Sequence, residues 1–147
     1  MNLTARCLVE GEAEGVVAYW SIPLSFWGGY DVERGRVIDR SHPAFGAEIA
    51  GRVLAMPSGR GSSSASSVLA EAIRRGTAPA AIILTIADPI ITVGAIVAHK
   101  LYGRTCPVVV CDAADFARLS EGMRVRVDAR EGACEIVASG DCTPDRS

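Results

Sequence analysis

Apolar residues in the middle of the chain form three continuous runs separated by two stretches with helical spacing. The runs at 53–56, 80–86 and 107–111 are typical of strands buried on both faces. Between them, residues 65–75 and 90–102 place apolar side chains three and four positions apart, as on the buried face of a helix. The pattern therefore predicts a β-α-β-α-β unit with a parallel sheet.

The predicted helices are bounded by residues that favour helix ends. Gly76 follows the first helix and Gly103 the second, and glycine readily takes the left-handed conformation that ends a helix. Asp88 precedes the second helix, which has a proline at its first position. Asp112 is placed to cap a shorter helix over 113–119.

Strand-like alternation of apolar and polar residues returns on both sides of this unit. Residues 3–20 predict two short strands around a Glu- and Gly-rich turn, and residues 31–39 resemble a hairpin around Gly35. Residues 123–138 predict another hairpin with a Glu-Gly turn. We expect the terminal β segments to pair into a small barrel or a second sheet layer, which makes the chain a mixed α/β domain.

Length and composition fit one domain over residues 1–147, with the residues from about 139 polar and loosely held. The 15 Lys and Arg are balanced by 17 Asp and Glu, so charge gives no reason to expect binding to nucleic acid or a membrane surface. No apolar run approaches the roughly 20 residues that cross a bilayer, and the N-terminus lacks the apolar region of a secretory signal. We therefore expect a cytoplasmic protein.

The cysteines indicate neither a disulfide framework nor a metal site. They are odd in number, with no CxxC pair and no nearby cluster of histidines. Their positions are Cys7, Cys106, Cys111, Cys134 and Cys142. We interpret them as reduced thiols and expect no metal or other cofactor on this chain.

The stretch 57–67, Pro-Ser-Gly-Arg-Gly-Ser-Ser-Ser-Ala-Ser-Ser, joins the first predicted strand to the first predicted helix. It has neither the lysine of a Walker loop nor GxGxxG spacing, so the pattern alone is moderately specific. Its glycines let the backbone approach a ligand, while the helix N-terminus and the charge of Arg60 attract an anion. The simpler alternative is a serine that caps the helix, but a cap needs only one hydroxyl. The surplus hydroxyls favour an anion-binding site.

A serine such as Ser62 accepts a proton only if it is strongly activated, because its pKa lies near water's value of about 15.7. The helix N-terminus contributes at most about 2 kcal/mol, and an arginine charge at about 4 Å contributes about 4 kcal/mol at an effective dielectric constant of about 20. Together these correspond to about 4 pKa units. The sequence contains no second catalytic constellation, so we expect a partner chain to complete the site.

Two loop segments are further candidates. Residues 23–30 combine two aromatics with paired glycines, and the aromatics either close one end of the core or contact a substrate or subunit. His42 is either a proton carrier or, as is commoner for a single loop histidine, a hydrogen-bonding surface or core residue. The residues alone leave both alternatives open.

Several of these segments together resemble the small-subunit, or swivel, domain of aconitase X proteins over residues 8–127. The matching motifs are Pro23-Leu24-Ser25-Phe26-Trp27-Gly28-Gly29, Ile38-Asp39-x-x-His42-Pro43, Gly51-Arg52-Val53-Leu54, Gly59-Arg60-Gly61-Ser62 and Gly94-Ala95-Ile96-Val97-Ala98. The resemblance implies the swivelling β/β/α fold of the aconitase C-terminal domain. It also implies docking on a large subunit, or a fused large domain, that carries an iron–sulfur cluster, with the active site between the two.

The resemblance further implies roles for the turn. The serine directly after Gly-Arg-Gly, Ser62, is the expected proton acceptor. The expected residues for binding a small anionic substrate are Arg60, Gly61, Ser63, Ser64 and, in the aromatic loop, Ser25. The family reactions are dehydrations of cis-3-hydroxy-L-proline and of mevalonate 5-phosphate, and the aromatic loop and the Ser-Ser-Ala-Ser run favour the hydroxyproline type. The alternatives are the mevalonate 5-phosphate reaction and a non-catalytic module that binds anions or acts as a scaffold.

Overall fold

The computed structural model describes residues 2–60 and 62–138. Within them the chain forms an eight-stranded sheet, a two-stranded hairpin and four helices. The strands are β1 (Asn2–Thr4), β2 (Arg6–Val9), β3 (Gly11–Tyr19), β4 (Tyr30–Asp31), β5 (Arg36–Val37), β6 (Val53–Ala55), β7 (Ala81–Leu84), β8 (Val108–Val110), β9 (Arg124–Ala129) and β10 (Glu135–Ala138). The helices are α1 (Phe26–Gly29), α2 (Ala65–Arg75), α3 (Pro89–Tyr102) and α4 (Ala113–Phe116). The end segment expected to be loosely held lies outside the described residues.

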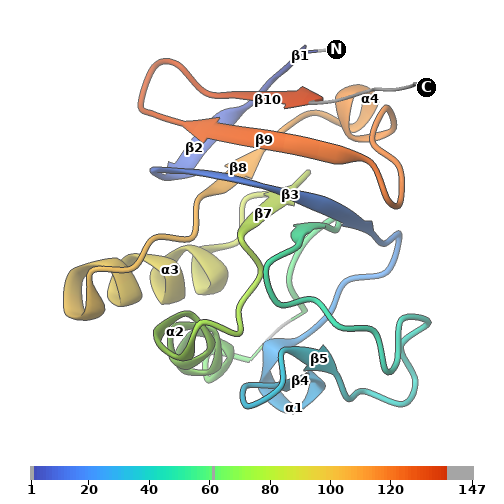
Figure 1. Cartoon of the computed structure of the whole chain (residues 1–147), viewed down its shortest axis with the longest axis vertical. Helices are drawn as coiled ribbons and strands as arrows, with labels where there is room; N and C mark the ends of the chain where they lie inside the picture. The colour runs from blue at the N-terminus through green and yellow to red at the C-terminus, as the bar shows by residue number, and fades with distance from the viewer. Residues whose placement is uncertain (1, 61, 139–147) are drawn as a thin grey trace, which may run out of the picture.

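The centre of the sheet is the predicted β-α-β-α-β unit. Strands β6, β7 and β8 run parallel and lie side by side in this order, and α2 and α3 connect them (Figure 1). All residues of β6 and β7 are buried, as expected for parallel strands covered on both faces. The prediction of a mixed α/β fold with a parallel core is confirmed.

The helix boundaries follow the predicted capping residues. Helix α2 ends at Gly76, which has a left-handed φ of 80° and donates its N–H to the last turn. Helix α3 begins after Asp88, whose carboxylate accepts two N–H groups of the first turn. Helix α4 is capped by Asp112 as expected but ends at Phe116, so it is shorter than predicted.

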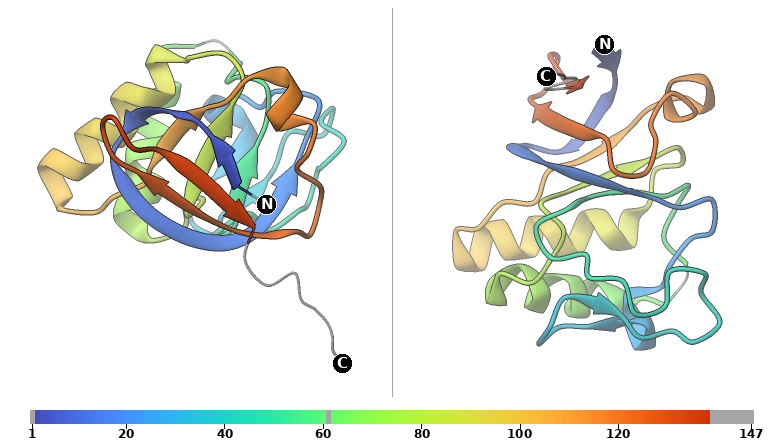
Figure 2. Two further views of the ribbon diagram at one scale, coloured as in Figure 1. Left: turned by 90° about the horizontal axis from the view of Figure 1, so that it is seen from above. Right: turned by 45° about the vertical axis from the view of Figure 1, so that its right-hand side comes forward.

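The sheet closes on itself through the N-terminal segment. Its strand order is β1-β10-β9-β3-β6-β7-β8-β2, so the two edges are strands that follow one another in the chain. Only Ala5 separates them, and its N–H donates to the carbonyl oxygen of Cys134 at 3.1 Å. The result is a small barrel, one of the two arrangements expected for the terminal β segments, seen from above in the left view of Figure 2.

The prediction of two short strands around a turn over residues 3–20 is wrong, because the Glu- and Gly-rich stretch is itself the long strand β3. Glu12 and Glu14 are exposed and form ion pairs with Arg126 and Arg124 on the antiparallel neighbour β9. Cross-strand pairs of this kind stabilise a strand whose own residues favour a turn.

Two apolar cores lie on the two faces of the sheet. The barrel interior contains Leu3, Val17, Val53, Ile83, Val109, Phe116, Val127 and Ile136. The second core lies between the parallel strands and the helices and contains Leu54, Leu69, Ile73, Ile82, Leu84, Ile91 and Ala95. Successive residues of one strand, such as Ile82 and Ile83, therefore belong to opposite cores.

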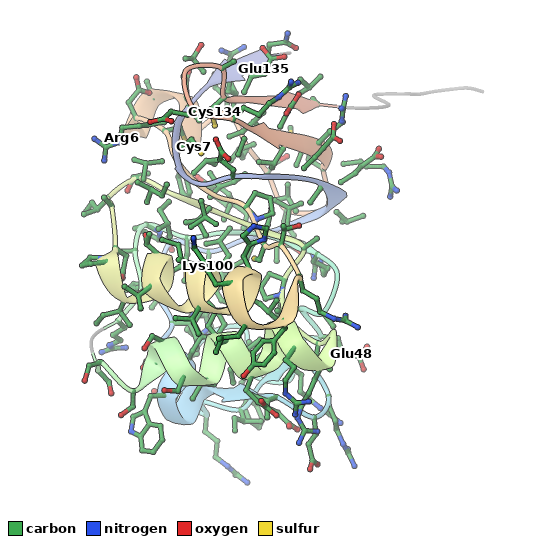
Figure 3. All side chains as sticks on the ribbon, turned by 90° about the vertical axis from the view of Figure 1, so that its left-hand side faces the viewer. Arg6, Cys7, Glu48, Lys100, Cys134 and Glu135 are labelled. Atoms are coloured by element: carbon green, nitrogen blue, oxygen red, sulfur yellow. The ribbon has the colours of Figure 1, made fainter. Side chains whose placement is uncertain are left out.

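Four of the five cysteines lie within the described residues, and all four are free thiols. Burial raises the pKa of Cys106 to about 12 and that of Cys134 to about 11. Figure 3 shows Cys7 and Cys134 at the barrel end of the molecule, above α3 and α2. The fifth, Cys142, lies outside the described residues.

Helix α1 and the hairpin β4–β5 form a small layer beside α2 (Figure 1). The hairpin predicted over residues 31–39 is confirmed, although its first strand begins at Tyr30. In α1, Phe26 is buried against Tyr30 with ring centroids 5.1 Å apart, whereas Trp27 is 59% exposed. One aromatic therefore closes the core, and the other is presented to solvent.

Helix α3 passes very close to the first turn of α2 at Gly94. A Cβ at this position would lie 2.7 Å from the carbonyl oxygen of Ser66 and 3.3 Å from the Cβ of Leu69. We predict that Gly94→Ala destabilises the fold by about 1–3 kcal/mol through overpacking, although alanine is the better helix former. Urea or thermal unfolding measures the change. Val93→Ala on the exposed side of α3 is the control, expected within about 0.5 kcal/mol; equal losses would contradict the close-contact explanation.

Candidate active site

The Ser-rich turn follows β6 and lies at the carboxyl edge of the parallel strands. The N–H groups of Thr85 and Ile86, which follow β7, donate to the carbonyl oxygen of Pro57 at 3.0 and 3.1 Å. On the other side of the turn, Gly59 forms a parallel bridge with Leu24. Both open and closed α/β sheets bind ligands at the carboxyl ends of their parallel strands, so the topology supports the turn as the site.

Ser62 has a backbone conformation that serine rarely adopts. Its φ is 96°, and among residues 2–60 and 62–138 it is the only non-glycine residue with positive φ. Such strain costs on the order of 1–3 kcal/mol and persists only where the surroundings hold it. The carbonyl oxygen of Ser62 accepts the N–H of Ala65 at 3.0 Å, which joins the strained residue to the start of α2. Its strain and its exposed side chain mark Ser62 as a functional candidate.

The hydroxyls at the end of the turn do not cap α2. Ser64 occupies the N-cap position, but its side chain makes no capping hydrogen bond. The hydroxyl of Ser66 donates to the carbonyl oxygen of Ser63 at 2.9 Å, within the turn itself. This geometry does not favour the helix-cap interpretation, and the exposed side chains of Ser62, Ser63 and Ser64 face solvent.

The backbone N–H groups that are available to bind an anion precede α2 and do not belong to the helix itself. Those of Ala65 and Ser66 donate to the carbonyl oxygens of Ser62 and Ser63. Within the part of the chain that the structure describes, no backbone acceptor is paired with the N–H groups of Ser62, Ser63 or Ser64. The anion site consequently lies just before the helix, where the dipole still favours negative charge.

Arg60 lies on the same turn with an exposed side chain. Its guanidinium takes part in none of the ion pairs formed among the described residues. The pKa of the Asp39 carboxyl is lowered mainly by hydrogen bonds from the hydroxyl and N–H of Ser41, and to a smaller extent by the charge of Arg60. Arg60 thus brings positive charge to the turn. Gly61, the other expected binding residue here, lies outside the described residues.

Ser25 lies in a segment beside the turn, and His42 belongs to a separate loop. Ser25 follows Leu24, the residue that bridges to the turn, so its backbone lies next to the site. His42 is buried, with Nε2 3.2 Å from the carbonyl oxygen of Ile22 and Nδ1 accepting the N–H of Ala44 at 3.0 Å. Because both ring nitrogens are engaged, the geometry favours the hydrogen-bonding interpretation of His42 over a proton carrier.

One aspartate at the site is not identified as functional by the sequence. Asp88 accepts the N–H of Gly59 at 2.9 Å. The charge of Arg60 also acts weakly on Asp39, which belongs to another loop. The sequence identifies Asp88 only as a helix cap and Asp39 only as part of a motif. The usable signal for Asp88 is its position just beyond the strand that neighbours the strand of the turn.

Side chains suited to metal binding are dispersed in the described ranges, where no group of three or more His, Cys, Asp and Glu is able to hold an ion. The described helices include none that is long and apolar enough to cross a membrane.

Known proteins match this chain over nearly its whole length. The family model of the aconitase X swivel domain matches residues 2–136. The chain is 46% identical over 127 residues to the cis-3-hydroxy-L-proline dehydratase of Pseudomonas aeruginosa, a match that covers 82% of this chain and 22% of that protein. It is 40% identical over 141 residues to the phosphomevalonate dehydratase small subunit of Pyrococcus furiosus, which covers 96% of this chain and 99% of that protein. The chain thus spans about a fifth of the first relative and nearly all of the second.

A solved structure has the same fold. The crystal structure of Thermococcus kodakaraensis aconitase X in its holo-form matches with a TM-score of 0.82 and 38% identity, covering 95% of this chain and 99% of that chain. The swivelling α/β fold expected from the sequence is thereby confirmed. With the family model, the relatives and the fold in agreement, the chain belongs to the aconitase X swivel domain family.

Proposed function

We propose that this chain is the small subunit of an aconitase X-type hydro-lyase, in which Ser62 accepts the proton. The observation that carries the proposal is the strained, exposed Ser62 beside Arg60 at the carboxyl edge of the sheet. It is supported by relatives named cis-3-hydroxy-L-proline dehydratase and phosphomevalonate dehydratase small subunit.

The proposed reaction follows from what the two named substrates share. Both are carboxylates with a hydroxyl on the carbon next to the one that bears the carboxylate. The Oγ of Ser62 takes the proton from the carboxylate-bearing carbon, a double bond forms, and the neighbouring hydroxyl departs as hydroxide. The hydroxide takes up one proton from solvent to become water, and Ser62 returns the proton that it accepted to solvent, so the protons balance. Arg60 and the free N–H groups of the turn hold the carboxylate, where negative charge develops as the proton departs.

The residues that this chain contributes to the site are insufficient to activate the hydroxyl of Ser62. The helix end and Arg60 together supply about 4 units of pKa lowering for a serine hydroxyl, which leaves several units to a facing surface. The chain corresponds to 22% of the P. aeruginosa dehydratase, so a separate large subunit would supply the remainder and the facing wall. The expected iron–sulfur cluster would also belong to that subunit, because the cysteines described in this chain are not grouped as cluster ligands.

We favour cis-3-hydroxy-L-proline as the substrate. The chain is 46% identical to a dehydratase of that name and 40% identical to a phosphomevalonate dehydratase small subunit. Mevalonate 5-phosphate is the second candidate, favoured by the match to nearly the full length of that small subunit. A non-catalytic anion-binding or scaffolding module is the remaining alternative, and the strained conformation of Ser62 argues against it.

The first prediction concerns the hydroxyl of Ser62. In the heteromer formed with the large subunit, Ser62→Ala should lower kcat for dehydration by about 10²–10⁴-fold, the usual worth of a positioned proton acceptor. Both substrates should be assayed. Ser67→Ala removes an exposed hydroxyl on α2 and should leave kcat unchanged. Full activity of Ser62→Ala would show that the assigned role is wrong.

The second prediction separates stability from activity. Ser62→Gly should stabilise the isolated chain by about 1 kcal/mol, because glycine relieves the positive-φ strain and this outweighs its added chain entropy. The same variant should be inactive in the heteromer. Ser63→Gly, at a position without positive φ, should instead be neutral or destabilising. Thermal unfolding gives both values, and a loss of stability in Ser62→Gly would mean that its backbone is not strained.

The third prediction concerns the surface that meets the large subunit. Three exposed apolar residues lie on segments that adjoin the turn, and we call them the apolar rim: Ile86, whose N–H donates to Pro57, and Ile22 and Trp27, which flank Leu24, the residue that bridges to Gly59. Trp27→Ser should raise the Kd of the heteromer at least about tenfold, because buried tryptophans are common anchors of interfaces. Leu101→Ser is the control: Leu101 is 67% exposed but lies at the far end of α3, about 20 Å along the helix. Calorimetric titration measures the Kd of both variants. A higher Kd for Leu101→Ser with no change for Trp27→Ser would show that the apolar rim does not contact the large subunit.

A further inference from the structure

We propose that Asp88 is a positioning residue that fixes the Gly-Arg-Gly-Ser turn so that Ser62 is presented to the substrate. The proposal rests on the proposed function of Ser62 and adds a residue to it. Asp88 does not belong to the turn; it lies between β7 and α3, on the neighbouring crossover of the sheet.

One carboxylate joins two elements. Its Oδ2 accepts the N–H of Gly59 at 2.9 Å, and its Oδ1 accepts the N–H groups of Ile90 and Ile91 at 2.9 and 3.1 Å. The first bond holds the turn after β6, and the other two cap α3. Hydrogen bonds to a charged acceptor are about twice as strong as neutral ones, so the turn is held firmly against the end of α3.

The identity of residue 59 depends on this contact. A Cβ at Gly59 would lie 2.4 Å from Oδ2 of Asp88 and 2.8 Å from Cδ1 of Ile91. Glycine is therefore required for the backbone to approach the carboxylate so closely. The backbone is held on two further sides, since Gly59 bridges to Leu24 and its carbonyl oxygen accepts the hydroxyl of Ser58 at 2.9 Å.

The hydrogen bond from Gly59 to Asp88 restrains the backbone that leads to Ser62. The strained serine is three residues beyond Gly59, and on its other side its carbonyl oxygen is bonded to Ala65 at the start of α2. A positive φ at a serine persists only if both flanks are fixed. On the N-terminal flank Asp88 holds Gly59, and the N–H of Arg60 donates to the carbonyl oxygen of Leu24 at 3.3 Å. Without the bond to Asp88 we expect the turn to relax toward an ordinary conformation that moves the hydroxyl.

A purely structural role as the α3 cap is the competing explanation, and two substitutions separate them. Serine caps helices about as well as aspartate, but its single oxygen cannot bond the helix and Gly59 together. Asparagine matches aspartate in size but keeps one acceptor oxygen, so one of the two connections is lost. Asp112→Ser is the matched control, because Asp112 caps α4 through the N–H of Asp115 at 2.8 Å and lies outside the turn.

The experiment has two readouts on the full chain. In ¹⁵N-labelled protein, Asp88→Ser should shift the Gly59 amide resonance and raise its exchange rate about tenfold or more, with little change in melting temperature. In the heteromer with the large subunit, Asp88→Ser and Asp88→Asn should lower kcat about tenfold or more while KM changes less than about threefold. Asp112→Ser should alter neither.

Each other outcome rejects the inference. A Gly59 amide that stays protected in both variants shows that Asp88 does not hold the turn, whatever the reaction. An exposed Gly59 amide with unchanged kcat, alongside an inactive Ser62→Ala, shows that holding the turn does not position Ser62. Unfolding of both variants assigns Asp88 to the fold alone. Activity in Ser62→Ala, by contrast, rejects the proposed function, and the amide exchange still decides whether Asp88 holds the turn.

Discussion

Parallel strands can be joined only by a connection that crosses back over a face of the sheet, and this constraint organises the molecule. Because β6, β7 and β8 are parallel, the segments that follow them all emerge at one edge. The Ser-rich turn follows β6 and Asp88 follows β7. Residues nearly thirty positions apart in the sequence thereby come within hydrogen-bonding distance, and the site is a product of the topology as much as of its own motif.

Features that depend on residues close together in the sequence are predictable, and features that depend on contacts between distant residues are not. The parallel unit and the ends of α2 and α3 depend on local spacing and capping, and these predictions are confirmed. The strand β3 depends on pairing with β9 on one side and β6 on the other, and no local pattern reveals either neighbour. Likewise the turn is recognisable from its glycines and serines, but the bond from Gly59 to Asp88 links residues separated by α2 and β7. The positive φ of Ser62 opposes the preference of serine itself, so local propensity points away from it.

The site has the physical character of one half of an interface. Its hydroxyls and arginine are exposed, its charge alone is insufficient to activate a serine, and exposed apolar side chains lie on the segments that adjoin it. An active site that worked without a partner would not be expected to have any of these three properties. All three are expected if a second protein surface covers the carboxyl edge of the parallel strands. Desolvation by that surface would strengthen the field of Arg60 at Ser62, because electrostatic interactions grow as water is excluded.

The pairing of β1 in the barrel also determines where another protein could be linked covalently without disturbing the candidate site. Asn2 pairs with Val137, so the two ends of the described chain lie side by side at the barrel, at the opposite end of the molecule from α1 (Figure 1). A tether attached there leaves the carboxyl edge of the parallel strands untouched. It would turn association with a partner protein into an intramolecular event, at millimolar effective concentration for a short flexible linker. Joining this domain to another through its barrel end therefore leaves the geometry of the candidate site unchanged.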